Sequence, residues 1–91
     1  MNIIKVVAGS NTEFIAIAIA EAYHDQGFVE VEAMGAEAAD QAIKAILTVK
    51  NQLIKEGVDI VFVLSMINVE IEGNVRMATK LVVKNKDDVS S

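Results

Sequence analysis

Apolar and polar residues follow one another along this chain in patterns that predict strands and helices in turn. Residues 3–8 (IIKVVA) are β-branched and mostly apolar, which is typical of a strand inside a sheet. Ser10 and Glu13 then have the S-x-x-E spacing of a capping box, in which both side chains accept hydrogen bonds from backbone N–H groups where a helix begins. A helix is therefore expected over residues 11–26, ended by Gly27 in the left-handed conformation that glycine adopts easily.

This first helix is unusual because it is apolar on every side, as the run FIAIAIAEA (14–22) shows. Isoleucine at every second position would also suit a strand, but the alanines between and the flanking caps favour a helix. A helix that is apolar all round has to be covered on both sides. One side is expected to pack on the sheet and the other to meet a second subunit through Phe14, Ile17 and Ile19; the alternative is that the alanine side faces water.

The next strand shows strict alternation. In residues 29–34 (VEVEAM), valine and alanine occupy one face while Glu30 and Glu32 occupy the other, as expected of a sheet that is covered on one side only. Gly35 then turns the chain into a second helix over residues 36–55. Its buried stripe is expected to consist of Ala39, Ala42, Ile43, Ile46, Val49 and Leu53, and the alanines let the helix lie close to the sheet.

Two further strands, 58–71 and 76–84, are expected to form a long hairpin that projects from the domain. The centre of the first, IVFVLSMI, indicates a strand covered on both faces. A two-residue turn at Gly73 and Asn74 would set Met77 opposite Glu70, whereas a three-residue loop sets Met77 opposite Ile71. The three-residue loop pairs like with like and is favoured. Arg76, Lys80 and Lys84 then lie along one face of the last strand.

The length of 91 residues corresponds to one small domain, expected over residues 1–86, with 87–91 as a flexible tail. There is no cysteine and a single histidine, so neither a disulfide framework nor a Cys/His zinc site is expected, and self-association is the remaining route to extra stability. The apolar runs are far shorter than the roughly 20 residues of a membrane-spanning helix, and no secretory pattern precedes them. A cytoplasmic protein without membrane contact is expected.

The net charge is −5, which argues against indiscriminate binding to a polyanion. The charge is unevenly distributed, because residues 1–40 hold one basic and seven acidic residues, whereas 41–91 hold seven basic and six acidic residues. Any nucleic acid is therefore expected to contact the second half of the chain.

The order strand, helix, strand, helix, strand, strand, together with particular segments, resembles the stage V sporulation protein S family. The segments are IIKVVAGSN, VEVEAMGAEAADQAIKAI, GVDIVFV and IEGNVRMATKLVV, which together cover nearly the whole chain. The resemblance implies an Alba-like β-α-β-α-β-β fold of the two-layer α+β class. In such a fold a mixed four-stranded sheet carries both helices on one face.

The resemblance also implies a dimer, or a higher oligomer such as a tetramer, that binds nucleic acid through three places. These are the loop after the first strand, the second helix and the projecting hairpin. Transferred to this chain, and joined by Lys84 of the same basic strand face, the candidate nucleic-acid-binding residues are Ser10, Asn11, Thr12, Lys44, Arg76, Lys80 and Lys84.

Three classes of function remain to be weighed. As a binding module, the protein would contact DNA or RNA phosphates without reading bases, helped by backbone N–H groups at the start of the first helix. The alternatives are a merely solvated basic strand face and a regulatory scaffold that acts through protein contacts. An enzyme is the least supported class: VAGSNT lacks the Gly-Lys-Ser/Thr of a P-loop, and no histidine lies near Ser10 in sequence. No catalytic residue, metal, cofactor or small-molecule substrate is therefore expected.

Overall fold

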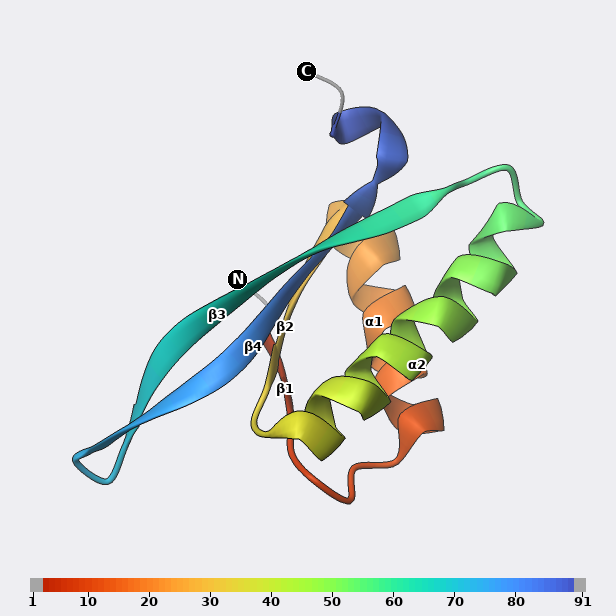
Figure 1. Ribbon diagram of the computed structural model, residues 1–91. Helices are drawn as coiled ribbons and strands as arrows, with labels where there is room; N and C mark the ends of the chain where they lie inside the picture. The colour runs from red at the N-terminus through yellow and green to blue at the C-terminus, as the bar shows by residue number, and fades with distance from the viewer. Residues whose placement is uncertain (1–2, 90–91) are drawn as a thin grey trace.

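The computed structural model describes residues 3–89, which form a two-layer domain (Figure 1). Its elements follow the predicted order: β1 (Ile3–Val6), α1 (Thr12–Gln26), β2 (Phe28–Ala33), α2 (Ala36–Ile54), β3 (Ile60–Ile71), β4 (Asn74–Asn85) and a short 3-10 turn η1 (Lys86–Asp88). The strands form one mixed sheet in the order β1-β2-β4-β3, with β1 parallel to β2 and the other neighbours antiparallel. Both helices cover the same face, so the predicted fold class is confirmed.

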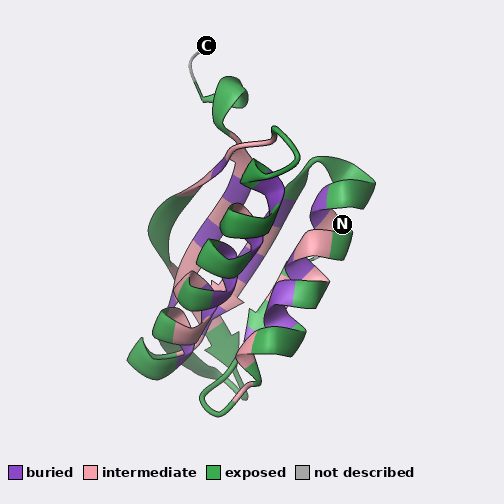
Figure 2. Ribbon diagram, turned by 90° about the vertical axis from the view of Figure 1, so that its right-hand side faces the viewer, coloured by how far each residue is buried: buried purple, intermediate pink, exposed green. Residues whose placement is uncertain are grey.

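The core lies between the sheet and the two helices, where buried residues from both layers meet (Figure 2). The predicted alternation of β2 is confirmed, since Val29, Val31 and Ala33 are buried and the glutamates between them face away from the helices. From α2 the buried residues are Ala38, Ala42, Ala45, Ile46, Val49 and Leu53. The alanines among them bring α2 close to the sheet, whereas Ala39 and Ile43 of the predicted stripe lie at its partly exposed margin.

The prediction of β1 as a strand inside the sheet is wrong, because β1 and β3 form the two edges of the sheet. The prediction that the centre of β3 is covered on both faces is also wrong. Within β3 only Ile60 is buried, and residues 63–66 are exposed. The physical reason is that β3 and β4 continue past the ends of the helices as the projecting hairpin (Figure 1). An apolar run alone does not reveal whether a helix lies over it.

The hairpin turn also differs from the prediction, because a two-residue turn replaces the three-residue loop. Ile71 pairs with Asn74 and Val69 with Arg76, so Glu72 and Gly73 form the turn. Both have positive φ, 50° and 81° respectively, as in the type I′ turns that match the twist of antiparallel strands. Neither register considered from the sequence had Glu72 in this conformation, which few non-glycine residues adopt.

The start of α1 corrects the predicted capping box. Asn11 is the N-cap, and its Oδ1 accepts hydrogen bonds from the backbone N–H groups of Glu13 and Phe14 at 2.9 and 3.2 Å. The Ser10 hydroxyl instead donates to the Val7 carbonyl oxygen at 2.7 Å and accepts from the Val7 N–H. The end of α1 is as predicted, with Gly27 in the left-handed conformation and its N–H bonded to the Tyr23 carbonyl oxygen.

A charged cluster around Asp59 joins the end of α2 to the start of β3 and to η1. Lys50 Nζ lies 2.6 Å from Asp59 Oδ1 and 2.7 Å from the Ile60 carbonyl oxygen, and Lys86 Nζ lies 3.9 Å from Asp59 Oδ2. The hydrogen bond from Lys50 is the main reason that the pKa of Asp59 lies below its ordinary value of 3.8. The predicted tail, 87–91, thus begins within an ordered turn, and its last two residues lie outside the described part of the chain.

Within residues 3–89, neither helix combines the length and the hydropathy that crossing a lipid bilayer requires.

Candidate nucleic-acid interface

The face of the sheet opposite the helices, called the open face below, carries the basic residues of β4. Leu81 and Val83 are buried against the helices, so the alternate residues Arg76, Lys80 and Lys84 point to the open face, as the sequence predicted. Residues four apart along a strand lie about 13 Å from each other. The three side chains therefore form an extended row rather than a cluster.

The middle residue of this row, Lys80, is already paired with a carboxylate. Its Nζ lies 3.1 Å from Oε1 of Glu30 on β2, and both side chains are partly buried. Glu32 lies directly across from Lys80 in the β2–β4 register. The two glutamates of the open face therefore offset the charge of Lys80 and reduce its availability to a phosphate.

Arg76 and Lys84 lie in different surroundings. The register of β2 with β4 ends at Thr79, so Arg76 projects beyond β2 on the hairpin, next to Val69 of β3. Lys84 pairs with Phe28 on one side and with Val61 on the other. Among residues 3–89 no ion pair involves either side chain. Lys5 of β1, next to Glu32, is likewise exposed on the open face without an ion pair among the described residues.

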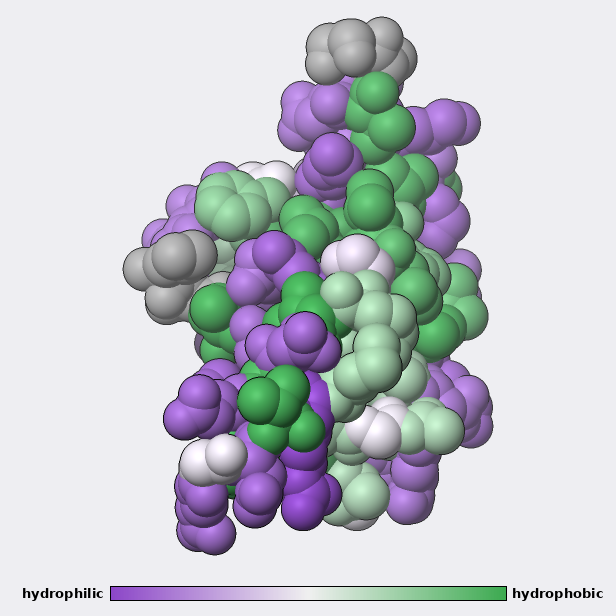
Figure 3. All heavy atoms as spheres, turned by 60° about the vertical axis from the view of Figure 1, so that its left-hand side comes forward, coloured by the Kyte–Doolittle hydropathy of each residue, from purple (hydrophilic) through white to green (hydrophobic). Residues whose placement is uncertain are grey.

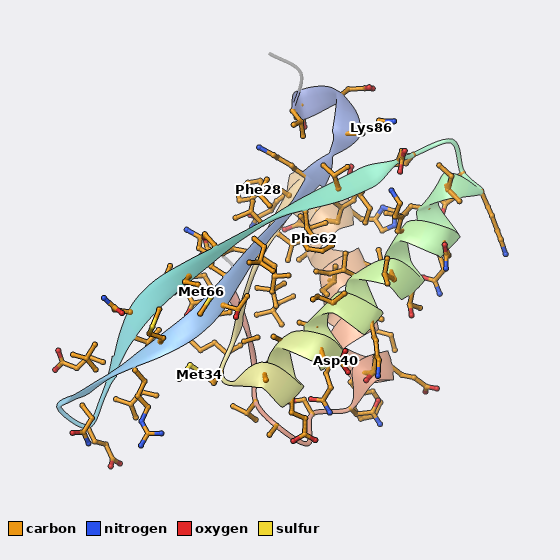
Figure 4. All side chains as sticks on the ribbon, in the orientation of Figure 1. Phe28, Met34, Asp40, Phe62, Met66 and Lys86 are labelled. Carbon is orange, nitrogen blue, oxygen red and sulfur yellow. The ribbon has the colours of Figure 1, made fainter. Side chains whose placement is uncertain are left out.

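Phe28 is a binding candidate that the sequence reasoning missed. Its side chain is 45% exposed and lies on the open face, away from the helices, whereas Phe62 points toward α2 (Figure 4). An exposed aromatic ring beside a lysine is the combination that supports stacking on a nucleic-acid base. The alternation of β2 contained the signal, because Phe28 precedes buried Val29 and must therefore share the face of Glu30.

Lys44 lies on the outer side of α2, opposite the buried stripe, and not on the open face. Its Nζ is 2.9 Å from Oδ2 of Asp40, one helical turn earlier, and both side chains are well exposed. The hydrogen bond to this carboxylate raises the pKa of Lys44 above its ordinary value. The structure therefore does not bring Lys44 together with Lys80 and Lys84.

The loop before α1 uses its polar groups locally. The Ser10 N–H and hydroxyl both donate to the Val7 carbonyl oxygen, and the Asn11 side chain caps the first turn of α1. The first-turn donors that would meet a phosphate, the N–H groups of Glu13 and Phe14, thus already have an acceptor. Ser10, Asn11 and Thr12 therefore shape this loop. They have fewer hydrogen-bond donors available for an anion than the sequence suggested.

Topology nevertheless brings the first loop and the hairpin to one end of the molecule. Because β1 and β2 are parallel, the loops that follow them lie at the same edge of the sheet. Because β4 is antiparallel to β2, the β3–β4 hairpin also projects from that end (Figure 1). Lys44, in the first half of α2, is near this end too. Two of the three predicted contact places therefore flank the hairpin.

The hairpin also exposes an apolar surface, and its part from β3 belongs to the run IVFVLSMI that was predicted to be covered. Leu64, Met66, Val75 and Met77 lie on its helix-facing side, beyond the reach of the helices, and all are at least half exposed. Figure 3 brings the side of the sheet away from the helices toward the viewer, and on that side too a band of hydrophobic residues lies between hydrophilic ones. β3 has 12 residues against 6 in β2. This length was the signal that the strand extends beyond the helices.

No group of three or more His, Cys, Asp or Glu side chains that would hold a metal ion occurs within residues 3–89. The Asp59 cluster consists of one carboxylate between two lysines and is structural.

The chain was compared with known proteins. A family model described as Stage V sporulation protein S (SpoVS) matches residues 2–86. Among solved structures, Alba from Thermoplasma volcanium is similar with a TM-score of 0.59 and 15% sequence identity. The similarity covers 90% of this chain and 95% of that one. At this identity the second comparison shows the shared fold.

Proposed function

Because the chain belongs to the stage V sporulation protein S family, which connects it with sporulation, we propose that it is a non-enzymatic regulatory protein that binds the backbone of nucleic acid as a dimer or higher oligomer. The observation that carries this proposal is the composition of the open face. Arg76 and Lys84 lie there without an ion pair among the described residues, and exposed Phe28 lies beside Lys84. Cations for phosphates and a ring for a base are the parts that sequence-independent binding uses.

The acidic residues of α1 and α2 lie on the helix layer, on the other side of the sheet from Arg76 and Lys84. Glu30 and Glu32, however, share the open face with these cations, so part of the net charge of −5 acts against a bound phosphate. Binding through so few cations is expected to be weak for a single protomer. Each phosphate contact contributes about 0.9 to the slope of log K against log salt on duplex DNA, so a protomer with two contacts gives a slope of about 2.

Self-association would join the open faces of several protomers into one site and raise the apparent affinity. Two apolar surfaces support it: the helix-facing side of the hairpin and the exposed side of α1. On α1, Phe14 is 71% and Ile17 56% exposed, whereas Ile19 is fully buried. The proposed interface on α1 is therefore restricted to Phe14 and Ile17, and Ile19 belongs to the core. Two separate self-associating surfaces would build assemblies larger than a dimer.

The test is fluorescence anisotropy of labelled duplex DNA and single-stranded RNA, titrated with protein at low and at near-physiological salt. The single variants Arg76→Glu and Lys84→Glu are each compared with Lys55→Glu, which makes the same charge change at the exposed end of α2. We expect salt-sensitive binding that each open-face variant weakens, that the two together abolish, and that the control largely keeps. An equal loss in the control would reduce the effect to net charge and remove the open face from the proposal.

A second candidate function, a regulatory scaffold that acts through protein contacts, is favoured by the Glu30–Lys80 pair and by the local use of the Ser10 and Asn11 side chains. Both reduce what the protein offers to a phosphate. If the protein still self-associates but binds neither DNA nor RNA at low salt, the scaffold function is supported instead.

A further inference from the structure

An open groove of about 470 Å³ runs between α1 and α2 on the outer side of the helix layer. It is lined by Glu13, Ala16, Ile17, Ala20, Glu21 and His24 of α1 and by Thr48 and Gln52 of α2. The residues from α1 recur every three or four positions, so they form one continuous face of that helix. Ile17 lies near the middle of this face and Phe14 at its border, and both are more than half exposed.

We propose that the first helix of a second copy of this chain fills the groove, antiparallel to α1. This inference rests on the proposed function, in which the protein is an oligomer. It adds which element of the second copy contacts α1 and in which register the two helices pair. A two-fold axis then relates the copies, so each contact occurs twice.

The shape of the face suits a second copy. Ala16 and Ala20 form a low floor on either side of Ile17, and small residues allow two helices to approach closely. Setting Ile17 of one copy against Ala20 of the other places a large side chain over a small one. The same contact repeats on the other side of the axis, so both exposed isoleucines are covered at once.

Charge fixes the register. With Ile17 against Ala20 of the second copy, Glu13 of each copy lies opposite His24 of the other, and a histidine N–H can donate to that carboxylate. If Ile17 instead met Ile17 of the second copy, Glu13 would face Glu21, and such like-charge contacts are unfavourable.

The same carboxylates argue against nucleic acid in this groove. Glu13 and Glu21 rim it, and no lysine or arginine is among its lining residues. The groove is therefore a contact surface separate from the open face, which lies on the other side of the sheet.

The experiment measures the mass of the full chain by sedimentation equilibrium over a range of concentrations. His24→Glu sets an acid opposite Glu13, and we expect self-association at this surface to weaken about tenfold or more. Adding Glu13→Lys in the same chain restores an opposite-charge pair and should restore the mass. The matched control, Ala36→Glu, adds the same charge on the exposed first turn of α2, about three helical turns from Thr48, and should leave the mass unchanged. Circular dichroism verifies that each variant is folded.

The outcomes separate this inference from the proposed function. Loss of mass in the single variant with recovery in the double variant supports the antiparallel pairing. An oligomer whose mass is the same in the wild type and in His24→Glu overturns the pairing alone, and nucleic-acid binding measured separately continues to judge the open face. A wild type that stays monomeric at every concentration overturns both the pairing and the oligomeric part of the proposed function.

Discussion

Lys80 and Glu30 form an ion pair across neighbouring strands, with 3.1 Å between Nζ and Oε1, in the middle of the open face. Replacing Glu30 with Gln frees the lysine and removes a negative charge beside any bound phosphate. We expect Glu30→Gln to bind duplex DNA more tightly than the wild type and to steepen the salt dependence by about 0.9, the increment of one contact. Titrations at several salt concentrations measure this slope. Glu37→Gln, on the exposed first turn of α2, is the matched control, and an identical gain there would point to net charge.

Phe28 provides a way to distinguish stacking from phosphate contact. Phe28→Ala is expected to weaken binding to single-stranded RNA by about 1–3 kcal/mol if one base stacks on the ring, while binding to duplex DNA changes little because its bases are already stacked. Parallel anisotropy titrations of both ligands measure the difference. Phe14→Ala, which removes an even more exposed ring from the helix layer, serves as control at concentrations where the assembly state is unchanged. Equal effects on both ligands would contradict stacking.

Ile17 and Ile19 lie two positions apart on α1, but substitutions there are expected to affect different properties. Those at Ile19 affect stability, and those at Ile17 affect assembly. Ile19 is fully buried, so Ile19→Ala leaves a cavity and should lower the free energy of unfolding by about 2–5 kcal/mol. Ile17 is exposed, so Ile17→Ser should change the unfolding of the monomer by no more than about 0.5 kcal/mol and should reduce the mass of the assembly. Chemical denaturation and sedimentation measure the two effects. An Ile17→Ser protein with unchanged mass would exclude this side chain from the interface.

Asn11, and not Ser10, is the residue whose side chain caps α1. Asn11→Ala should therefore destabilise the domain by about 1 kcal/mol, the usual cost of losing an N-cap side chain. Asn11→Asp keeps an acceptor oxygen and places a negative charge at the helix N-terminus, so it should be close to neutral or stabilising. Thermal or urea unfolding of the two variants measures the contrast. Similar losses in both would show that the amide acts in some way other than as an acceptor.

Asp59 predicts a dependence of stability on pH with a definite sign. Its pKa in the folded protein lies below the ordinary value of 3.8, mainly because Lys50 donates a hydrogen bond to the carboxylate. A carboxyl whose pKa is lowered on folding stabilises the native state above its unfolded pKa, and this contribution is lost as the pH falls through the folded value. Asp59→Asn should therefore melt at a lower temperature than the wild type near neutral pH, and the difference should narrow below pH 3.8. A difference in melting temperature that is constant across this range would assign the effect to packing.

Features of the fold that depend on neighbouring residues were predicted from the sequence, whereas features that depend on distant segments were not. The alternation in β2 and the glycine that ends α1 are local features, and both predictions were confirmed. The edge position of β1 and the exposure of most of β3 were missed because both depend on contacts between distant segments. The turn was missed because Glu72 adopts a positive φ that its residue type seldom takes.

The candidate site shows the same division. That Arg76, Lys80 and Lys84 share one face followed from the period of a strand. Which of them is neutralised did not follow, because Glu30 reaches Lys80 only once β2 and β4 lie side by side. Lys44 was grouped with them by resemblance, but its position on the outer side of α2 separates it from the open face.

The place of β4 in the sheet bears on how the protein emerges from the ribosome. β4 is the last strand to be synthesised, yet it lies between β2 and β3 and pairs with both. Until residue 84 has left the exit tunnel, the nascent chain holds β2 with one open edge and β3 with no partner at all. Contacts between segments so distant in sequence form slowly. Until they form, the unpaired apolar strands are prone to aggregation. We expect this domain to reach its native sheet only after translation of β4 is complete, and any shortening that removes β4 to leave a chain that nascent-chain chaperones retain.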